Sequence, residues 1–256
     1  MKNPNQPRYR KALNPEQLRV LYALYKFRFG TTDLLASTMS KPVTRRYMNE
    51  RLRILCEQEY IARRYNSSYR LQARFASYHL LPKGIEVLKQ RNEPNVFNPL
   101  ALKNMRNDAN VSERFARHCL SIFTAYSKIL EIYGDGFKFF TKSYLLSPSF
   151  AYFPKPKPDA YIWFEKDEVT GKVRHYLMEC FDDTMPQSIM KKRIEYLVEH
   201  ADSSEWTTSS AYPTVLLVCD RDDLRKKAQK WAAKALEEGW TNELRIVAAT
   251  YSNLHL

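Results

Sequence analysis

The sequence predicts a mixed protein of α+β and α/β type, in which a basic helical domain with a small β-hairpin precedes a larger α/β domain. Its charge distribution indicates this division. Residues 1–100 carry 19 Lys and Arg against 7 Asp and Glu, whereas residues 101–256 carry 22 against 21. Prolines and polar residues gather between Arg91 and Pro99, as is typical of a domain boundary. We therefore expect a first domain at 1–93, a linker at 94–106 and a second domain at 107–256.

The composition narrows the class of protein. With 256 residues, 44% of them apolar, the chain is long enough to bury real cores. No uninterrupted apolar run reaches the 18 or so residues that a membrane span needs, so we expect a soluble cytoplasmic protein without membrane contact. The six glycines form no phosphate-binding motif, which argues against nucleotide-driven functions. The four cysteines are far apart and lack CxxC spacing, which favours free buried thiols.

The basic domain reads as three helices, a hairpin and a fourth helix. Asn14 and Pro15 are typical of a helix start, and the apolar spacing continues to Phe29. A short second helix follows the capping residues 31–33, and a third carries Met48, Leu52 and Leu55 on one face. Two extended runs flank the polar turn 66–68, and 81–88 returns to a helix. This order resembles the winged helix-turn-helix of bacterial regulators.

The predicted third helix and hairpin concentrate side chains that suit DNA. With the apolar face inward, the helix turns arginine and asparagine outward, and these side chains can pair with guanine and adenine edges in the major groove. The hairpin arginines suit phosphate or minor-groove contacts. A clustered positive excess also attracts a phosphate backbone through counterion release. The expected DNA-binding residues are Lys41, Arg45, Arg46, Asn49, Arg53, Arg63, Arg64, Arg70 and Arg74.

The second domain reads as αβββαβαβ, an α/β sheet with flanking helices. A long apolar-periodic helix is expected to end near Gly134. Strands are expected at 137–140, 160–164, 175–178, 214–219 and 244–248. Further helices are expected at 187–200 and 222–238.

Two carboxylates stand out in this pattern. Asp159 opens one predicted strand and Glu179 ends the next, so neighbouring strands would bring them together. This resembles the αβββαβ core of the PD-(D/E)XK nucleases, which implies Asp159 and Glu179 as metal ligands and catalytic residues. The lysine that this pattern expects two residues after the glutamate is replaced by Phe181. Lys192, from the following helix, is the candidate for the missing catalytic cation. Glu113 occupies a region where the superfamily often has another acid.

The whole chain, from about residue 14 to 250, resembles the replication-relaxation family of plasmids and mobile elements. The matching landmarks are Pro158-Asp159-Ala160, Glu179-Cys180-Phe181, Lys192 to Tyr196, and Arg117-His118. The resemblance implies a winged helix followed by a degenerate PD-(D/E)XK-like domain. Family members tend to carry Asp where this chain has Phe181, so we expect no cofactor and an inactive nuclease-like domain.

The resulting interpretation is a sequence-specific binder of double-stranded DNA that acts in plasmid replication or transfer, or in transcriptional regulation. Its second domain would serve as a platform for homodimerisation or for contacts with replication, transfer or transcription proteins. Two alternatives stay open. One is a Mg²⁺-dependent DNA endonuclease targeted by its winged helix, using Asp159, Glu179 and Lys192. The other is an adaptor whose basic end binds RNA, which would be expected to show an aromatic stacking platform.

Overall fold

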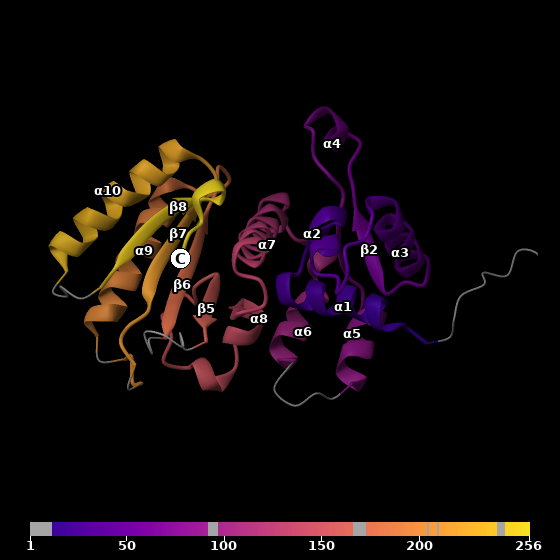
Figure 1. Cartoon of the computed structure of the whole chain (residues 1–256), viewed down its shortest axis with the longest axis horizontal. Coiled ribbons are helices and arrows are strands. Elements are labelled where there is room, and N and C mark those ends of the chain that lie inside the picture. Colours follow the sequence, from indigo (N-terminus) through magenta and orange to yellow (C-terminus); the bar gives the residue numbers. More distant parts are fainter. Residues whose placement is uncertain (1–11, 92–96, 166–172, 204, 209, 240–243) are drawn as a thin grey trace, which may run out of the picture.

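The computed structural model describes residues 12–91, 97–165, 173–203, 205–208, 210–239 and 244–256. These residues form a mixed α+β fold with one sheet of three strands and one of five. The N-terminal helices and the smaller sheet lie at one end of the molecule, and the larger sheet lies at the other (Figure 1). None of the helices described here has the length and apolar character needed to cross a membrane.

The first half follows the predicted order of elements, with one strand at Gly30–Thr31 that was not predicted. Asn14 caps the first helix through a reciprocal bond pair with Gln17, and Thr31 and Thr44 cap the next two, as expected for such side chains. The three-stranded sheet is antiparallel in the order β1-β3-β2. Its elements are α1 (Pro15–Phe27), β1 (Gly30–Thr31), α2 (Thr32–Ser37), α3 (Arg45–Glu57), β2 (Ile61–Arg64), α4 (Ser68–Leu71), β3 (Ser77–Leu80) and α5 (Pro82–Gln90).

The predicted hairpin is present, with a longer connection than expected. Strands β2 and β3 pair from Ile61 with Leu80 to Arg64 with Ser77. Between them the chain forms the one-turn helix α4, which begins at the end of the predicted turn. We call residues 61–80 the β2–β3 arm. The arm projects away from the other helices, with α4 at its tip (Figure 1).

The second half is built on the five-stranded sheet, in the order β4-β5-β6-β7-β8. The first three strands are antiparallel, and β6, β7 and β8 are parallel. The predicted strands and helices of this half are all present, with ends that shift by a few residues. Its elements are α6 (Pro99–Met105), α7 (Glu113–Tyr133), β4 (Phe137–Thr141), α8 (Lys142–Leu145), β5 (Ala160–Phe164), β6 (Arg174–Phe181), α9 (Gln187–Asp202), β7 (Thr214–Cys219), α10 (Asp222–Glu238) and β8 (Ile246–Thr250).

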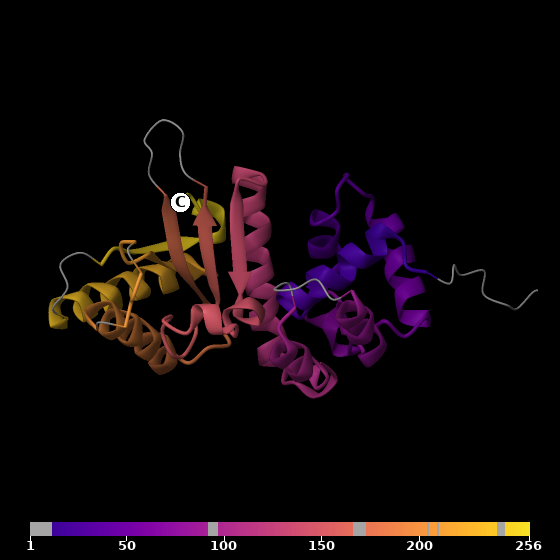
Figure 2. The same cartoon turned by 90° about the horizontal axis from the view of Figure 1, so that it is seen from below.

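Both faces of the larger sheet are covered, because alternate residues of a strand point to opposite faces. In β6, Met178 and Cys180 pack toward α7 and the N-terminal half, whereas Leu177 and Phe181 pack toward α9 and α10. Helix α7 lies between the sheet and the N-terminal helices in both views (Figures 1 and 2). The four cysteines are free, as predicted; Cys119, Cys180 and Cys219 are also buried as predicted, whereas Cys56 is only partly buried.

The two halves share one core. The Phe27 ring of α1 stacks on Phe123 of α7 with 4.0 Å between centroids, and the Asn98 backbone N–H donates to the Tyr25 hydroxyl at 2.7 Å. The predicted linker 94–106 begins outside the described residues. Its described part forms α6, which buries Leu102 and Met105. Packing contacts therefore connect the two halves across the predicted boundary.

Candidate functional site

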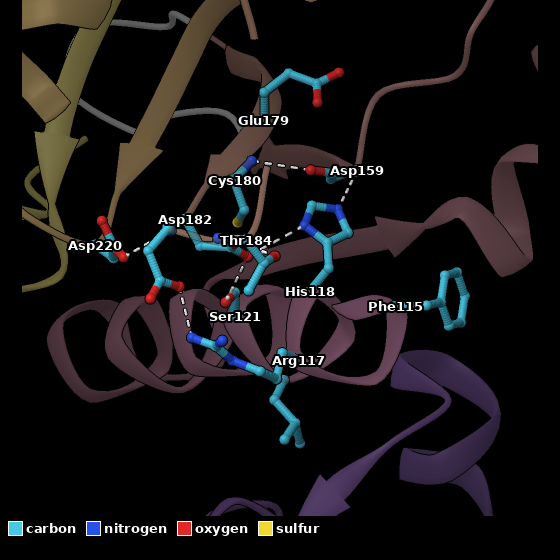
Figure 3. A network of polar contacts seen from close by, with 12 residues as sticks. Phe115, Arg117, His118, Ser121, Asp159, Glu179, Cys180, Asp182, Thr184 and Asp220 are labelled. Carbon is cyan, nitrogen blue, oxygen red and sulfur yellow. Dashed lines mark hydrogen bonds and ion pairs between the residues drawn. The ribbon is translucent and has the colours of Figure 1, made fainter. Parts of the chain in front are cut away.

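The structure brings the two predicted carboxylates together. Strands β5 and β6 pair Ala160 with Met178, and Asp159 and Glu179 stand beside that pair, with the Asp159 N–H donating to the Met178 carbonyl at 3.0 Å. Asp159 is 0% exposed and Glu179 is 2% exposed. The Cys180 N–H donates to Oδ2 of Asp159 at 2.9 Å (Figure 3). Buried carboxylates need such partners, because an unpaired buried charge is very costly.

Cationic side chains from three helices meet these carboxylates. Lys142 of α8 places Nζ 2.6 Å from Oδ1 of Asp159, and His118 of α7 places Nε2 3.0 Å from the same atom. Arg193 of α9 donates to Oδ1 of Asp159 at 3.2 Å and also to Oε2 of Glu179. We call Asp159, Glu179, Lys142, His118 and Arg193 the buried charge cluster, after its two buried carboxylates; the Lys142 side chain is 41% exposed.

Helix α9 contributes Arg193 to the buried charge cluster, whereas the sequence predicted Lys192 in this place. Lys192 is exposed on α9, and the contacts with both carboxylates come from its neighbour. A helix turns by about 100° per residue, so adjacent side chains face different directions. Arg193 lies three residues after buried Met190 and four before buried Leu197, which places it on the core side. That spacing is the sequence signal that would have singled out Arg193.

Burial and charge set the protonation of the cluster. Burial opposes ionisation of Asp159, but the charges of His118, Lys142 and Arg193 outweigh it and hold the pKa of Asp159 well below its usual range. Burial, followed by the Asp159 charge, raises the pKa of Glu179 to about 8. Burial alone would lower the pKa of His118, but the Asp159 carboxylate raises it to about 9. The histidine is therefore a cation at neutral pH.

The residues that follow Glu179 pack and hydrogen-bond next to the buried charge cluster. Phe181 is fully buried and packs on the α9–α10 side of the sheet. Oδ1 of Asp182 accepts the Thr184 N–H at 2.8 Å, and the Ser121 hydroxyl donates to Oδ2 at 3.3 Å (Figure 3). Burial would raise the pKa of Asp182, but the His118 ring, whose Nδ1 lies 3.6 Å from Oδ2, and the hydrogen bonds from Thr184 outweigh burial and lower it to about 2. Asp182 thus closes a turn, and Asp183 pairs with Arg117 at 2.5 Å.

These residues do not fit a divalent cation. Oδ1 of Asp159 already receives three nitrogen donors, and Arg193 lies against Glu179. A metal would have to enter beside three cationic groups, which oppose it electrostatically. Across the described ranges, no group of three or more His, Cys, Asp or Glu is arranged to hold a metal.

The predicted DNA-binding residues of α3 and its start form an exposed face. Met48, Leu52 and Leu55 are buried on the opposite side of the helix, as predicted. Several exposed side chains are held in place: Arg45 pairs with Asp33 at 3.5 Å, Arg53 with Glu50 at 2.6 Å, and the Asn49 amide oxygen accepts from the Thr32 hydroxyl at 2.9 Å. The exposed residues of this face, which we call the α3 face, are Lys41, Arg45, Arg46, Asn49 and Arg53.

The four predicted arginines of the β2–β3 arm divide into two pairs. Arg63 and Arg70 are exposed. Arg64 and Arg74 instead contact Glu113, the first residue of α7, at 3.3 and 3.1 Å. The Tyr69 hydroxyl donates to the same carboxylate at 2.5 Å. Glu113 therefore fastens the arm to α7 and is not part of the buried charge cluster. This contact spans 39 to 49 residues of sequence, beyond the reach of local patterns.

Comparison with known proteins gives no relative for this chain: it matches no family model, no curated protein and no solved structure. The α3 face, the β2–β3 arm and the buried charge cluster are the features from which a function must be argued.

Proposed function

We propose that this protein binds double-stranded DNA sequence-specifically, through the α3 face and the β2–β3 arm. The fold supports this proposal: helix, strand, two helices and two strands, with an antiparallel β1-β3-β2 sheet, is the order of a winged helix-turn-helix. In that arrangement α3 is the recognition helix and the β2–β3 arm is the wing.

The observation that carries the proposal is the one-sided placement of charge. Between Glu59 and Glu86 the chain has no Asp or Glu, and the arm within this stretch exposes Arg63 and Arg70. Arg45, in the first turn of α3, stacks its guanidinium on the Phe75 ring of the arm at 5.0 Å. The start of α3 and the arm therefore lie side by side and both expose arginines, with Asp33 and Glu50 paired to Arg45 and Arg53 on the helix side. On the α3 face, Arg46 and Asn49 suit base edges.

For the second half, we propose a PD-(D/E)XK-like domain that does not cleave DNA. The antiparallel β4-β5-β6 strands, followed by α9 and the parallel strand β7, agree with the αβββαβ core of those nucleases. The buried charge cluster then stabilises the fold where a nuclease would bind its metal. Together with the landmarks of the replication-relaxation family, this arrangement supports a mobile-element protein acting in plasmid replication or transfer, or in transcriptional regulation. Homodimerisation through this domain belongs to the same proposal.

The salt dependence of duplex binding tests the proposal. We expect the affinity of the full chain for duplex DNA to fall steeply with salt. The slope of the logarithm of the binding constant against the logarithm of the salt concentration should become shallower by about 1 for each phosphate contact that is removed. Arg63→Ala with Arg70→Ala should lower the slope by about 2. The matched control is Lys227→Ala with Lys230→Ala, two exposed lysines of α10, which should leave it unchanged. Equal effects of the two pairs would contradict the proposed surface.

One observation favours an endonuclease as the second candidate: Asp159 and Glu179 lie side by side at the end of neighbouring strands. Incubation of supercoiled plasmid with the protein in Mg²⁺ or Mn²⁺ separates the candidates. We expect no nicking. Cleavage by the wild type that Asp159→Ala abolishes would establish the nuclease and overturn the platform role.

A further inference from the structure

The tip of the β2–β3 arm exposes large apolar side chains. Leu71, the last residue of α4, is 90% exposed, Phe75 is 58% exposed and Tyr65 is 46% exposed. Single exposed apolar residues are common, but these three lie on one protruding segment, which extends beyond the other helices (Figure 1). Leu71 in particular is almost as accessible as in an extended chain.

The tip is also fixed in place. Tyr69, in the same helical turn, is 7% exposed, and its hydroxyl, together with Arg74, is bound by Glu113 of α7. Arg63 stacks on the Tyr65 ring at 4.7 Å and Arg45 on the Phe75 ring at 5.0 Å. Because Arg64, Tyr69 and Arg74 fasten the arm to α7 and Phe75 contacts the first turn of α3, Leu71 is held at a set position relative to the α3 face.

The charges around Leu71 define the partner. Arg70 precedes it directly and is exposed, and no acidic residue lies between Glu59 and Glu86. An apolar side chain beside exposed arginines suits a partner with anionic groups outside and apolar surface within, since the carboxylate that reaches the arm, Glu113, is already bound by Arg64, Arg74 and Tyr69. Duplex DNA has this combination, since its phosphates flank stacked bases, and Leu and Phe are among the side chains that wedge between base steps from the minor groove.

We propose that Leu71 is such a wedge: it enters the minor groove beside the major-groove site of α3 and kinks the duplex by partly unstacking one base step. This inference rests on the proposed DNA binding. Arg70 and Arg63 contact the phosphates on either side, which keeps the wedge in the groove. Pyrimidine–purine steps unstack most easily, so the protein prefers such a step under the arm, although Leu71 makes no hydrogen bond to it.

Bending of a duplex labelled with donor and acceptor dyes at its two ends tests the wedge by energy transfer. The wild type should raise the transfer efficiency on binding, and 2-aminopurine placed at the kinked step should brighten as it unstacks. Leu71→Ala should lose both signals at protein concentrations that saturate the duplex. The matched control is Leu100→Ala, an exposed leucine of α6 that is 51% accessible, which should keep both.

The outcomes separate this inference from the proposed function. Bending by Leu71→Ala equal to that of the wild type overturns the wedge and leaves DNA binding intact, whereas failure of the wild type to bind any duplex overturns both. Thermal melting shows whether Leu71→Ala folds like the wild type, as expected for so exposed a side chain. Two results would assign the tip to another partner and overturn the wedge: binding to phosphatidylserine vesicles, or self-association in sedimentation, in either case lost on Leu71→Ala.

Discussion

Replacing Arg193 with methionine probes the buried charge cluster most sharply. Arg193→Met keeps an unbranched side chain at this position of α9, but it removes the guanidinium that contacts both Asp159 and Glu179. Asp159 keeps His118, Lys142 and the Cys180 N–H. Glu179, at 2% exposure, loses the contact made by Arg193. The substitution therefore acts on both carboxyl groups.

The expected cost follows from leaving the two carboxyl groups buried without their arginine. Removing one partner of a buried ion pair costs roughly 3–5 kcal/mol. Burial and the Asp159 charge raise the pKa of Glu179 to about 8 even with Arg193 present, so Glu179 is mostly protonated at pH 7 and the loss there comes mainly from the ion pair of Arg193 with Asp159. We therefore expect the free energy of unfolding to fall by about 3 kcal/mol at both pH 5 and pH 7, and by more above pH 8, where Glu179 of the wild type ionises beside Arg193.

Urea denaturation of the variant and of Lys192→Met measures this difference. Lys192 is the exposed neighbour on the same helix, and its replacement should change the free energy of unfolding by no more than about 0.5 kcal/mol. At pH 9, adding Glu179→Gln to Arg193→Met should recover stability, because the carboxyl group that would ionise without its arginine is then gone. Equal losses for the two single variants would refute the role of Arg193, and so would a larger loss in the double variant at pH 9.

Two further predictions follow from contacts of α7. In His118→Asn, the dependence of stability on pH should flatten: the folded-state pKa of about 9 lies above the ordinary 6.5, so the stabilisation by the charged histidine is complete below pH 6.5 and is lost as pH rises through 9. The free energies of unfolding of wild type and variant, measured by thermal melting, should therefore converge by about 3 kcal/mol at most between pH 6.5 and pH 9. A constant difference between the two proteins over this range would contradict the prediction. In Glu113→Gln, Arg64 and Arg74 lose their carboxylate and become available to phosphates, so non-specific duplex binding should strengthen and its salt slope should steepen by about 1–2. Glu131→Gln, on the exposed side of α7, is the control that should change neither.

Local sequence signals predicted the elements that depend on local physics. Capping residues and apolar periodicity located α1 and α3, and runs of β-branched and aromatic residues located the strands of the larger sheet to within a few residues. The pairing of Asp159 with Glu179 was also predictable, because both residues stand at the ends of adjacent strands. Consecutive strands are often neighbours in a sheet, so the chain order favoured this pairing.

The parts that the sequence did not reveal depend on distant contacts or on rotation within a helix. Helices α4 and α8 are single turns, too short for a periodic pattern, so the tip of the arm and Lys142 were missed. Arg193 required the rotational phase of α9 and not only its basic run. The binding of Arg64 and Arg74 by Glu113 depends on how α7 packs against the arm, which no spacing in the chain encodes.

The central claim, sequence-specific duplex binding through the α3 face, is tested most directly by comparing two affinities. Duplexes selected from a random library by the wild type provide the cognate site, and a scrambled duplex of equal length and composition provides the reference. We predict that the wild type prefers the cognate site, and that Arg46→Ala with Asn49→Ala removes most of this preference, at about 1–3 kcal/mol for each base contact, while binding to the scrambled duplex changes little. A wild type without preference, or a double variant that keeps the full preference, would contradict the account.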